Sequence, residues 1–210
     1  MTQNRSHAVM AQRTEPHDSL DHFPTPPWAV RALCEHVLQI GEGSCLTAWE
    51  PACAEGYMAR ALEEYFRLVF ASDVHPYGFG FVADFLLPFP EDPGANWIIT
   101  NPPFKLAEDF IATGLRRANI GVAVLVRTTF LESIGRFERF FRDRPPTFVA
   151  QFVERVPMVK GRVDPKASTA TGYAWLVWDK CVKGRRSEMV WIPPCRKALE
   201  RPGDYERVAA

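Results

Sequence analysis

The tetrapeptide Asn101-Pro102-Pro103-Phe104 constrains the fold more than any other feature of the sequence. It follows residues 97–100, a short and largely β-branched run that predicts a buried strand. Its prolines can neither join a strand ladder nor continue a helix, and the first holds Asn101 outside the helical region. Residues 105–118 then predict a helix. The tetrapeptide is therefore a stiff turn at the carboxyl end of a strand, where open α/β sheets bind their ligands.

Strand-like and helix-like segments alternate along the rest of the chain. Further strands are predicted at residues 46–49, 68–72, 81–83, 121–126, 147–152 and 173–178. Helices are predicted at residues 27–39, 57–66 and 130–142, and Thr25 is the expected cap of the first. This alternation predicts an α/β fold with a mostly parallel sheet that ends in two antiparallel strands. Residues 189–192 are a candidate for one more short strand.

Length and composition are those of one globular domain of ordinary size. The chain has 210 residues, of which 47% are apolar and 24% charged, and its formal net charge is zero. This total does not indicate a strongly basic nucleic-acid binder, so any basic footprint must be local. The five cysteines lack metal-ligand spacing, which predicts reduced thiols, a cytoplasmic protein and no metal site. No apolar run has the length of a membrane span.

The two ends of the chain differ in pattern from its middle. Residues 1–20 are polar and aperiodic, which predicts a disordered arm, and His22 just after it is expected to be solvated. Residues 21–195 are predicted to form a single domain, and residues 196–210 a mobile tail.

Acidic residues follow three of the predicted strands. Glu50 opens a turn of small residues with a single glycine, which is a poor phosphate cradle but suits a cationic or hydroxyl-bearing ligand. Asp73 lies about 20 residues beyond that turn, where an acidic side chain binds ribose hydroxyls in doubly wound folds. Asp84 and Phe85 pair a carboxylate with an aromatic ring, which suits the amine and the flat face of an adenine.

These motifs, in this order, resemble those of S-adenosylmethionine-dependent DNA methyltransferases that methylate amino groups, in the arrangement called gamma, with N6 of adenine as the usual target. The segment Phe23-Pro24-Thr25-Pro26-Pro27-Trp28 resembles the motif beside the methionine part of the cofactor. Residues 50–56 resemble the (D/E)-P-x-x-G-x-G cofactor loop, although Ala54 stands where the family usually has glycine. Asn101 to Phe104 resembles the (D/N/S)-P-P-(Y/F/W) catalytic motif. Compact chains of this kind resemble phage-encoded enzymes.

The resemblance implies a Rossmann-like class I methyltransferase fold: a seven-stranded, mostly parallel sheet with helices on both faces and an antiparallel last strand. It implies S-adenosyl-L-methionine as cofactor and a catalytic motif of Asn101, Pro102, Pro103 and Phe104. The implied cofactor-binding residues are Phe23, Thr25, Pro26, Trp28, Glu50, Pro51, Ala52, Cys53, Gly56, Asp73, Val74, Asp84, Phe85 and Asn101.

The chemistry of an adenine amine explains the residue types of the catalytic motif. Its lone pair is delocalised into the ring, so the amine is a poor nucleophile. The Asn101 side-chain carbonyl and the Pro102 backbone carbonyl can accept both N–H bonds and direct the lone pair toward the methyl donor. Phe104 is expected to stack on a base that has been flipped out of its duplex.

Basic residues near the carboxyl ends of the later strands are candidates for nucleic-acid contact. Residues 154–171 form a long polar loop that we expect to face the substrate. The candidates are Arg127, Arg155, Lys160, Arg162 and Lys166. The helix at 130–142 is predicted to bury Phe130, Ile134, Phe137 and Phe141 and to expose a solvated row of arginines.

Three other functions share these sequence features. The catalytic string also resembles that of ribosomal-RNA and protein-glutamine methyltransferases. A non-catalytic nucleic-acid-binding subunit could keep the same scaffold, and a dinucleotide-binding oxidoreductase could use the same sheet, although GxGxxG is missing. Only about 30 residues follow the predicted strand at 173–178, which leaves no large target-recognition domain. Specificity would then come from the 154–171 loop or from a partner chain, unless the substrate is single-stranded DNA or RNA.

Overall fold

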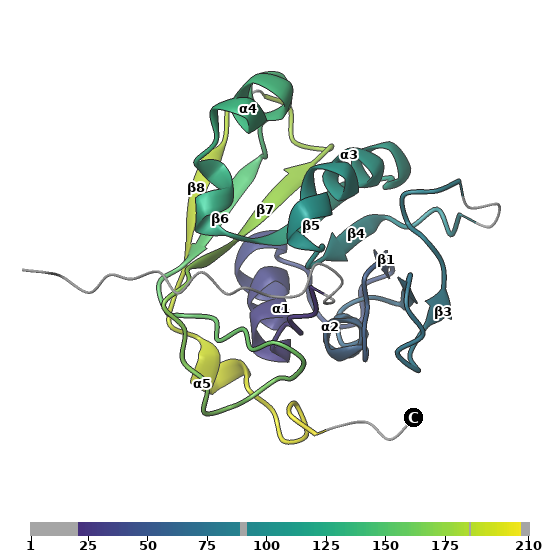
Figure 1. Cartoon of the computed structure of the whole chain (residues 1–210), viewed down its shortest axis with the longest axis vertical. Helices are drawn as coiled ribbons and strands as arrows, with labels where there is room; N and C mark the ends of the chain where they lie inside the picture. The colour runs from purple at the N-terminus through teal and green to yellow at the C-terminus, as the bar shows by residue number, and fades with distance from the viewer. Residues whose placement is uncertain (1–20, 89–91, 185, 207–210) are drawn as a thin grey trace, which may run out of the picture.

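The computed structural model describes residues 21–88, 92–184 and 186–206, and it contains one mixed sheet with helices on both faces (Figure 1). The spatial order of the strands is β3-β2-β1-β4-β5-β7-β6-β8. Within this sheet β7 runs antiparallel to both of its neighbours, and the other pairs are parallel. The strands are β1 Thr47–Glu50, β2 Leu68–Asp73, β3 Phe81–Val82, β4 Trp97–Thr100, β5 Gly121–Arg127, β6 Phe148–Phe152, β7 Tyr173–Asp179 and β8 Glu188–Ile192.

Helices pack against both faces of this sheet. One face is covered by α1 (Pro27–Leu33) and α2 (Tyr57–Leu62), and the other by α3 (Ala107–Arg117) and the π-helical turn η4 (Phe137–Phe141). The remaining helical segments are η1 Cys34–Leu38, η2 Phe104–Leu106, η3 Thr128–Leu131, α4 Ile134–Arg136 and α5 Arg196–Leu199.

The alternation of side chains along the central strands creates two separate cores. In β5, Ala123 and Leu125 pack toward α1 and α2, whereas Val122 and Val124 pack toward α3. Because both faces are covered, these strands read in the sequence as continuous apolar runs. The predicted α/β class and mostly parallel sheet are confirmed.

The sheet has eight described strands where seven were predicted. The additional strand is β8, the candidate at residues 189–192, which pairs in parallel with β6 at the edge of the sheet. It packs Val190 and Ile192 on the α1 side, while Met189 and Trp191 remain 50% and 63% exposed. The antiparallel strand β7 is therefore neither at the edge nor last in the chain.

The predicted single helix at 130–142 is wrong. The segment divides into η3, α4 and η4, and Ser133 caps α4 by accepting from the Arg136 N–H. Phe140 is buried, and the predicted Phe141 is half-buried against the same core. Phe130 is buried as predicted, but Ile134 and Phe137 are 81% and 55% exposed.

Residues 196–206, predicted to belong to a mobile tail, pack against α1 in the structure. Arg31 of α1 is buried and forms a bidentate pair with Asp204, and it also donates to the backbone carbonyl of Leu199. The sequence did not indicate these contacts because the partners are far apart in the chain. The predicted arm at 1–20 and the last four residues lie outside the described part of the chain. No helix of the described residues is long and apolar enough to cross a membrane.

Candidate active site

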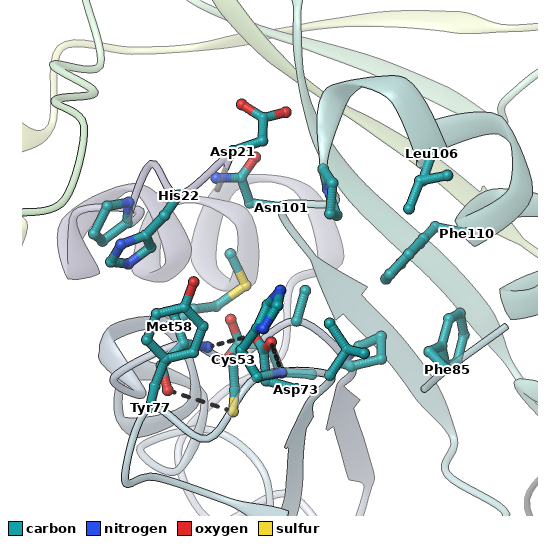
Figure 2. Close-up of a pocket in the computed structure, with 18 of the residues that line it drawn as sticks. Asp21, His22, Cys53, Met58, Asp73, Tyr77, Phe85, Asn101, Leu106 and Phe110 are labelled. Carbon is teal, nitrogen blue, oxygen red and sulfur yellow. Dashed lines mark hydrogen bonds between the residues drawn. The ribbon is translucent and has the colours of Figure 1, made fainter. Parts of the chain in front are cut away.

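A cavity of about 370 Å³ opens at the carboxyl ends of β1, β2 and β4. These strands are parallel neighbours, so the residues that follow them meet at one edge of the sheet. Figure 2 shows Asp73 and Cys53 at one side of this cavity, Asn101 and Asp21 across from them, and Phe85, Leu106 and Phe110 gathered at one end. The cavity therefore combines a polar region with an apolar end.

Most of the predicted cofactor-binding residues line this cavity. They are Phe23, Thr25, Glu50, Pro51, Ala52, Cys53, Asp73, Val74, Asp84, Phe85 and Asn101. Pro26, Trp28 and Gly56 do not line it. Trp28 is fully buried against Phe152, and Gly56 begins α2 with a φ of 83°, where an added Cβ would lie 2.4 Å from the Phe79 ring. Trp28 and Gly56 are therefore packing positions and do not face the cavity.

Asn101 is held in one orientation by the segment before α1. Its Nδ2 donates to the backbone carbonyl of Phe23 at 2.8 Å. Its Oδ1 is buried and has no hydrogen-bond partner. Because the amide nitrogen is already bound to an acceptor, the oxygen must be the atom that is presented to a ligand. Asn101 thus offers one free acceptor to a donor group.

Glu50 ends β1 and is almost completely buried in the cavity wall, with 2% of its surface exposed. Burial raises the pKa of the Glu50 carboxyl well above its usual range; a hydrogen bond from the backbone of Ala59 opposes this shift, and the nearby Asp73 adds to it. Its Oε2 has no hydrogen-bond partner. A buried carboxyl with an unpaired oxygen favours a ligand that brings a positive charge or a hydrogen-bond donor.

Thr25 was predicted to cap α1, but this prediction is wrong. The capping position is Pro26, and no side chain bonds the first turn. The Thr25 hydroxyl is instead buried in the cavity wall without a hydrogen-bond partner. Proline occupies the first helical positions, where a missing N–H leaves less for a cap to satisfy. Thr25 is therefore free to bind a ligand.

Asp73 organises the loop that follows β1. Its Oδ2 accepts from the Ala54 N–H at 3.0 Å, and its Oδ1 accepts from the His75 N–H at 2.9 Å. The backbone of Ala54 is left-handed, with a φ of 43°. Alanine disfavours this conformation because of its Cβ. Ala54, which stands where the resembled cofactor loop has glycine, is therefore a strained residue that Asp73 holds in place.

Replacing Ala54 by glycine is expected to stabilise the protein. Glycine removes the left-handed penalty of about 1–2 kcal/mol but adds freedom to the unfolded chain, so the free energy of unfolding should rise by about 0.5–1 kcal/mol. Urea unfolding of the two proteins measures this change. Ala52→Gly, in the same loop, is the matched control and should be destabilising. A loss of stability in Ala54→Gly would show that the loop is not strained at this residue.

The apolar end of the cavity is built by aromatic residues from two elements. Phe85 is buried between Trp49 and Phe110, with ring centroids 5.1 Å from each. Val74 is exposed on the cavity, and Asp84 is exposed beside it, with its Oδ1 accepting from the Leu86 N–H. A flat, weakly polar ring is the kind of group that such a surface accommodates.

A second cavity of about 180 Å³ lies on the other side of the diproline turn. Asn101 and Pro103 line the first cavity, whereas Pro102 and Phe104 line the second. The remaining walls of the second cavity come from Ala107, Val126, Arg127, Thr129, Phe130 and Arg136. The turn therefore separates two binding spaces and contributes side chains to both.

Known structures with the same architecture were found by comparison of the fold. A protein from Vibrio vulnificus described as a modification subunit of a type I restriction enzyme aligns with a TM-score of 0.57 and 15% identity, covering 81% of this chain and 47% of that one. A type I restriction-modification methyltransferase subunit from Streptococcus thermophilus aligns with a TM-score of 0.57 and 11% identity, covering 90% and 50%. A Pyrococcus horikoshii protein described as an RNA methyltransferase aligns with a TM-score of 0.56 and 14% identity, covering 79% and 90%.

This chain has the fold of class I methyltransferases. It spans about half the length of the two restriction-system subunits. No protein-family model and no curated protein matches the sequence.

Several cavity residues were missed in the sequence: some lie in aperiodic segments, and others lie in helices that were predicted without a role in the site. His22 was expected to be solvated, but its Nε2 lies 2.8 Å from the Glu55 carboxylate and its ring packs on Tyr77. Burial raises the pKa of Tyr77 to about 12, and the nearby acids Asp73 and Glu55 add to the shift. Asp21 accepts from the Phe104 N–H at 2.6 Å, which fixes the turn. The other residues missed are Tyr57, Met58, His75, Leu106 and Phe110.

Of the predicted nucleic-acid contacts, only Arg127 lines either cavity of the described chain. Arg155 is exposed next to Gly172, and Arg162 pairs with Asp164 at 3.2 Å. Lys160 and Lys166 belong to the same loop. Part of this loop is not exposed to solvent, because Val156 and Met158 are buried in the core. Its Gly161 N–H donates to the His22 carbonyl, so its turn does reach the segment that lines the first cavity.

The described residues contain no group of three or more His, Cys, Asp or Glu side chains arranged to hold a metal ion. All five cysteines are free thiols; Cys34, Cys53 and Cys195 are buried, and Cys45 and Cys181 are exposed.

Proposed function

We propose that the chain is an S-adenosyl-L-methionine-dependent methyltransferase that modifies N6 of adenine in DNA. The observation that carries this proposal is the free acceptor of Asn101. Its Oδ1 is buried without a partner while its Nδ2 is bound to the Phe23 carbonyl, at a turn that borders two cavities. One cavity would hold the methyl donor and the other the base that receives the methyl group.

The first cavity fits the proposed cofactor. Three buried or half-buried polar atoms in its wall lack partners: Thr25 Oγ1, Glu50 Oε2 and Asn101 Oδ1. Thr25 and Glu50 would bind the amino-acid end, Asp73 the ribose hydroxyls, and Asp84 with the apolar end near Phe85 the adenine. When bound, S-adenosyl-L-methionine supplies an electrophilic methyl group on a sulfonium and leaves as a neutral thioether.

The residues of the turn would prepare the target amine for methylation. Asn101 Oδ1 and the Pro102 carbonyl accept its two N–H bonds and so hold the nitrogen lone pair toward the first cavity. An asparagine cannot take up a proton, so the turn orients the amine and stabilises the charge that develops on it. After the N–C bond has formed, the extra proton on that nitrogen leaves to solvent.

The second cavity supports a base as the target. Phe104 presents its ring there, and aromatic stacking contributes about 1–3 kcal/mol per base, which offsets part of the cost of flipping it from a duplex. Two structural neighbours are described as subunits of restriction systems. Their descriptions support DNA as the substrate and a partner chain that supplies target recognition. The neighbour described as an RNA methyltransferase makes RNA the second candidate.

Transfer of tritiated methyl groups tests the proposal. The purified chain would be incubated with tritiated cofactor and duplex DNA, single-stranded DNA, ribosomal RNA or a protein extract. We expect label in DNA and N6-methyladenine in its digest. Label in RNA or in protein glutamine would replace DNA as the substrate. Cofactor binding without label in any of the four would support a non-catalytic subunit, and binding of NAD instead would support an oxidoreductase.

The variant Glu50→Gln separates the effect of Glu50 on the stability of the protein from its effect on cofactor binding. Because the folded-state pKa of Glu50 is raised, its contribution to stability is full below its ordinary pKa of 4.5 and is lost as pH rises through the raised value. We expect Glu50→Gln to raise the Tm of the ligand-free protein at neutral pH and to remove this pH dependence. Loss of a hydrogen bond to a charged group should weaken cofactor binding by about 10- to 100-fold.

The wild-type affinity should also rise as pH rises through the raised pKa, because a cationic ligand binds the carboxylate form. Calorimetry at several pH values and thermal melts measure both effects. Glu63→Gln, on the exposed end of α2, is the control and should change neither. A lower Tm for ligand-free Glu50→Gln would contradict the interpretation.

A further inference from the structure

We propose that Arg127 is a placeholder in the target-base site: its guanidinium covers the stacking face of Phe104 in the free protein and gives way to the incoming base. This inference rests on the proposed function and adds a positioning residue to it. The displaced side chain then contacts a phosphate of the bound strand.

The position of the guanidinium is the first observation. The Arg127 Cζ lies 3.9 Å from the centroid of the Phe104 ring, which is a close cation–π contact. Both residues line the second cavity. A base that stacks on this face needs the same contact distance from the ring, so the base and the guanidinium exclude one another.

A second aromatic ring also packs against Phe104. The Phe23 ring lies 5.5 Å from that of Phe104, tilted by 37°, and Phe23 itself lines the first cavity. The segment of Phe23 also binds Asn101 through its carbonyl and is part of the catalytic arrangement. A base can therefore reach Phe104 through the second cavity by moving Arg127, without disturbing Asn101.

Arg127 is placed to move, whereas the other arginine of this cavity is fixed. Arg136 donates to the Phe130 carbonyl at 2.9 Å and pairs with Glu108 at 3.2 Å. Arg127 ends β5, is exposed to solvent, and bonds the hydroxyl of Tyr173, its partner in the β5–β7 register. No carboxylate pair with Arg127 occurs among the described ion pairs. Its charge is thus available for a phosphate once the ring is vacated.

Two fluorescent probes distinguish stacking from phosphate contact: 2-aminopurine nucleoside, which has no phosphate, and a single-stranded oligonucleotide that contains 2-aminopurine. We expect Arg127→Ala to bind the nucleoside about two- to five-fold more tightly, because a cation–π contact no longer competes. The same variant should bind the oligonucleotide with a slope of log K against log salt that is smaller by about 0.7. Arg127→Lys keeps the charge, so it should keep the salt slope and change nucleoside affinity less than Arg127→Ala does. Arg142→Ala, an exposed arginine outside both cavities, should change neither.

The outcomes separate this inference from the proposed function. Weaker or unchanged nucleoside binding in Arg127→Ala, with binding still dependent on Phe104, would overturn the placeholder role alone. Nucleoside binding that survives Phe104→Ala in both the wild-type and the Arg127→Ala backgrounds would overturn the target site itself.

Discussion

Asn101→Ala is expected to lower the rate of methyl transfer by about 10²- to 10³-fold, the usual effect of removing one preorganised polar group from a transition state. The alanine removes the buried Oδ1 acceptor, which would otherwise stabilise the amine as it gains positive charge. It leaves the diproline turn and Glu50 in place. Binding of S-adenosyl-L-methionine should therefore stay within about five-fold of the wild type, since one uncharged hydrogen bond is worth roughly 1 kcal/mol.

Single-turnover transfer of tritiated methyl groups and calorimetry of cofactor binding measure the two quantities separately. Asn119→Ala removes an exposed amide that bonds the Gly94 carbonyl, and it serves as the control with full activity. If Asn101→Ala methylates within a few-fold of wild type while the cofactor still binds, the turn is not catalytic, and the proposed mechanism fails even if the substrate is correct.

The location of this site was accessible from sequence because it depends on local chemistry and one topological rule. Apolar runs of four to seven residues identified the central strands, and the polar residue after each run marked its carboxyl end. Parallel strands bring those ends together. Glu50, Asp73 and Asn101, which are spread over about 50 residues of sequence, consequently line one cavity.

The features that were missed depend on contacts between distant segments. Nothing near His22 in the sequence indicates its pairing with Glu55, and Asp21 reaches Phe104 across a separation of 83 residues. The predicted buried face of residues 130–142 was wrong because it assumed one continuous helix, whereas the chain breaks between Leu131 and Ile134. The expectation of seven strands came from the family resemblance. The eighth strand, β8, has its own pattern of exposed residues and a buried end at Ile192.

The two cavities also explain why a diproline turn is useful here. Phe104 and Asn101 are three residues apart and line different cavities, which in the proposed mechanism hold the base and the methyl donor. A flexible turn would let either side chain exchange sides. Fixed φ angles at both prolines prevent this, and the Asp21 carboxylate holds the next N–H. The rigidity of the turn thus preorganises the acceptor before the base arrives.

The largest expected effect on stability comes from Arg31→Met. Arg31 is 3% exposed and bonds Glu64 of the α2 region and Asp204 of the C-terminal segment with good bidentate geometry. Methionine leaves the Asp204 side chain, itself 6% exposed, as a buried charge without this partner. Breaking such a pair from one side destabilises a protein by about 3–5 kcal/mol, and we expect a loss of free energy of unfolding in that range.

Arg201→Met is the matched control, because Arg201 also pairs with Glu64 but is 45% exposed. Solvent screening should limit its effect to about 0–1 kcal/mol. Urea unfolding of both variants gives the comparison, and Asp204→Asn in the Arg31→Met background should recover part of the loss by neutralising the orphaned carboxylate. Equal effects of Arg31→Met and Arg201→Met would mean that burial does not strengthen this pair, and that the C-terminal segment is not held to α1 by Arg31.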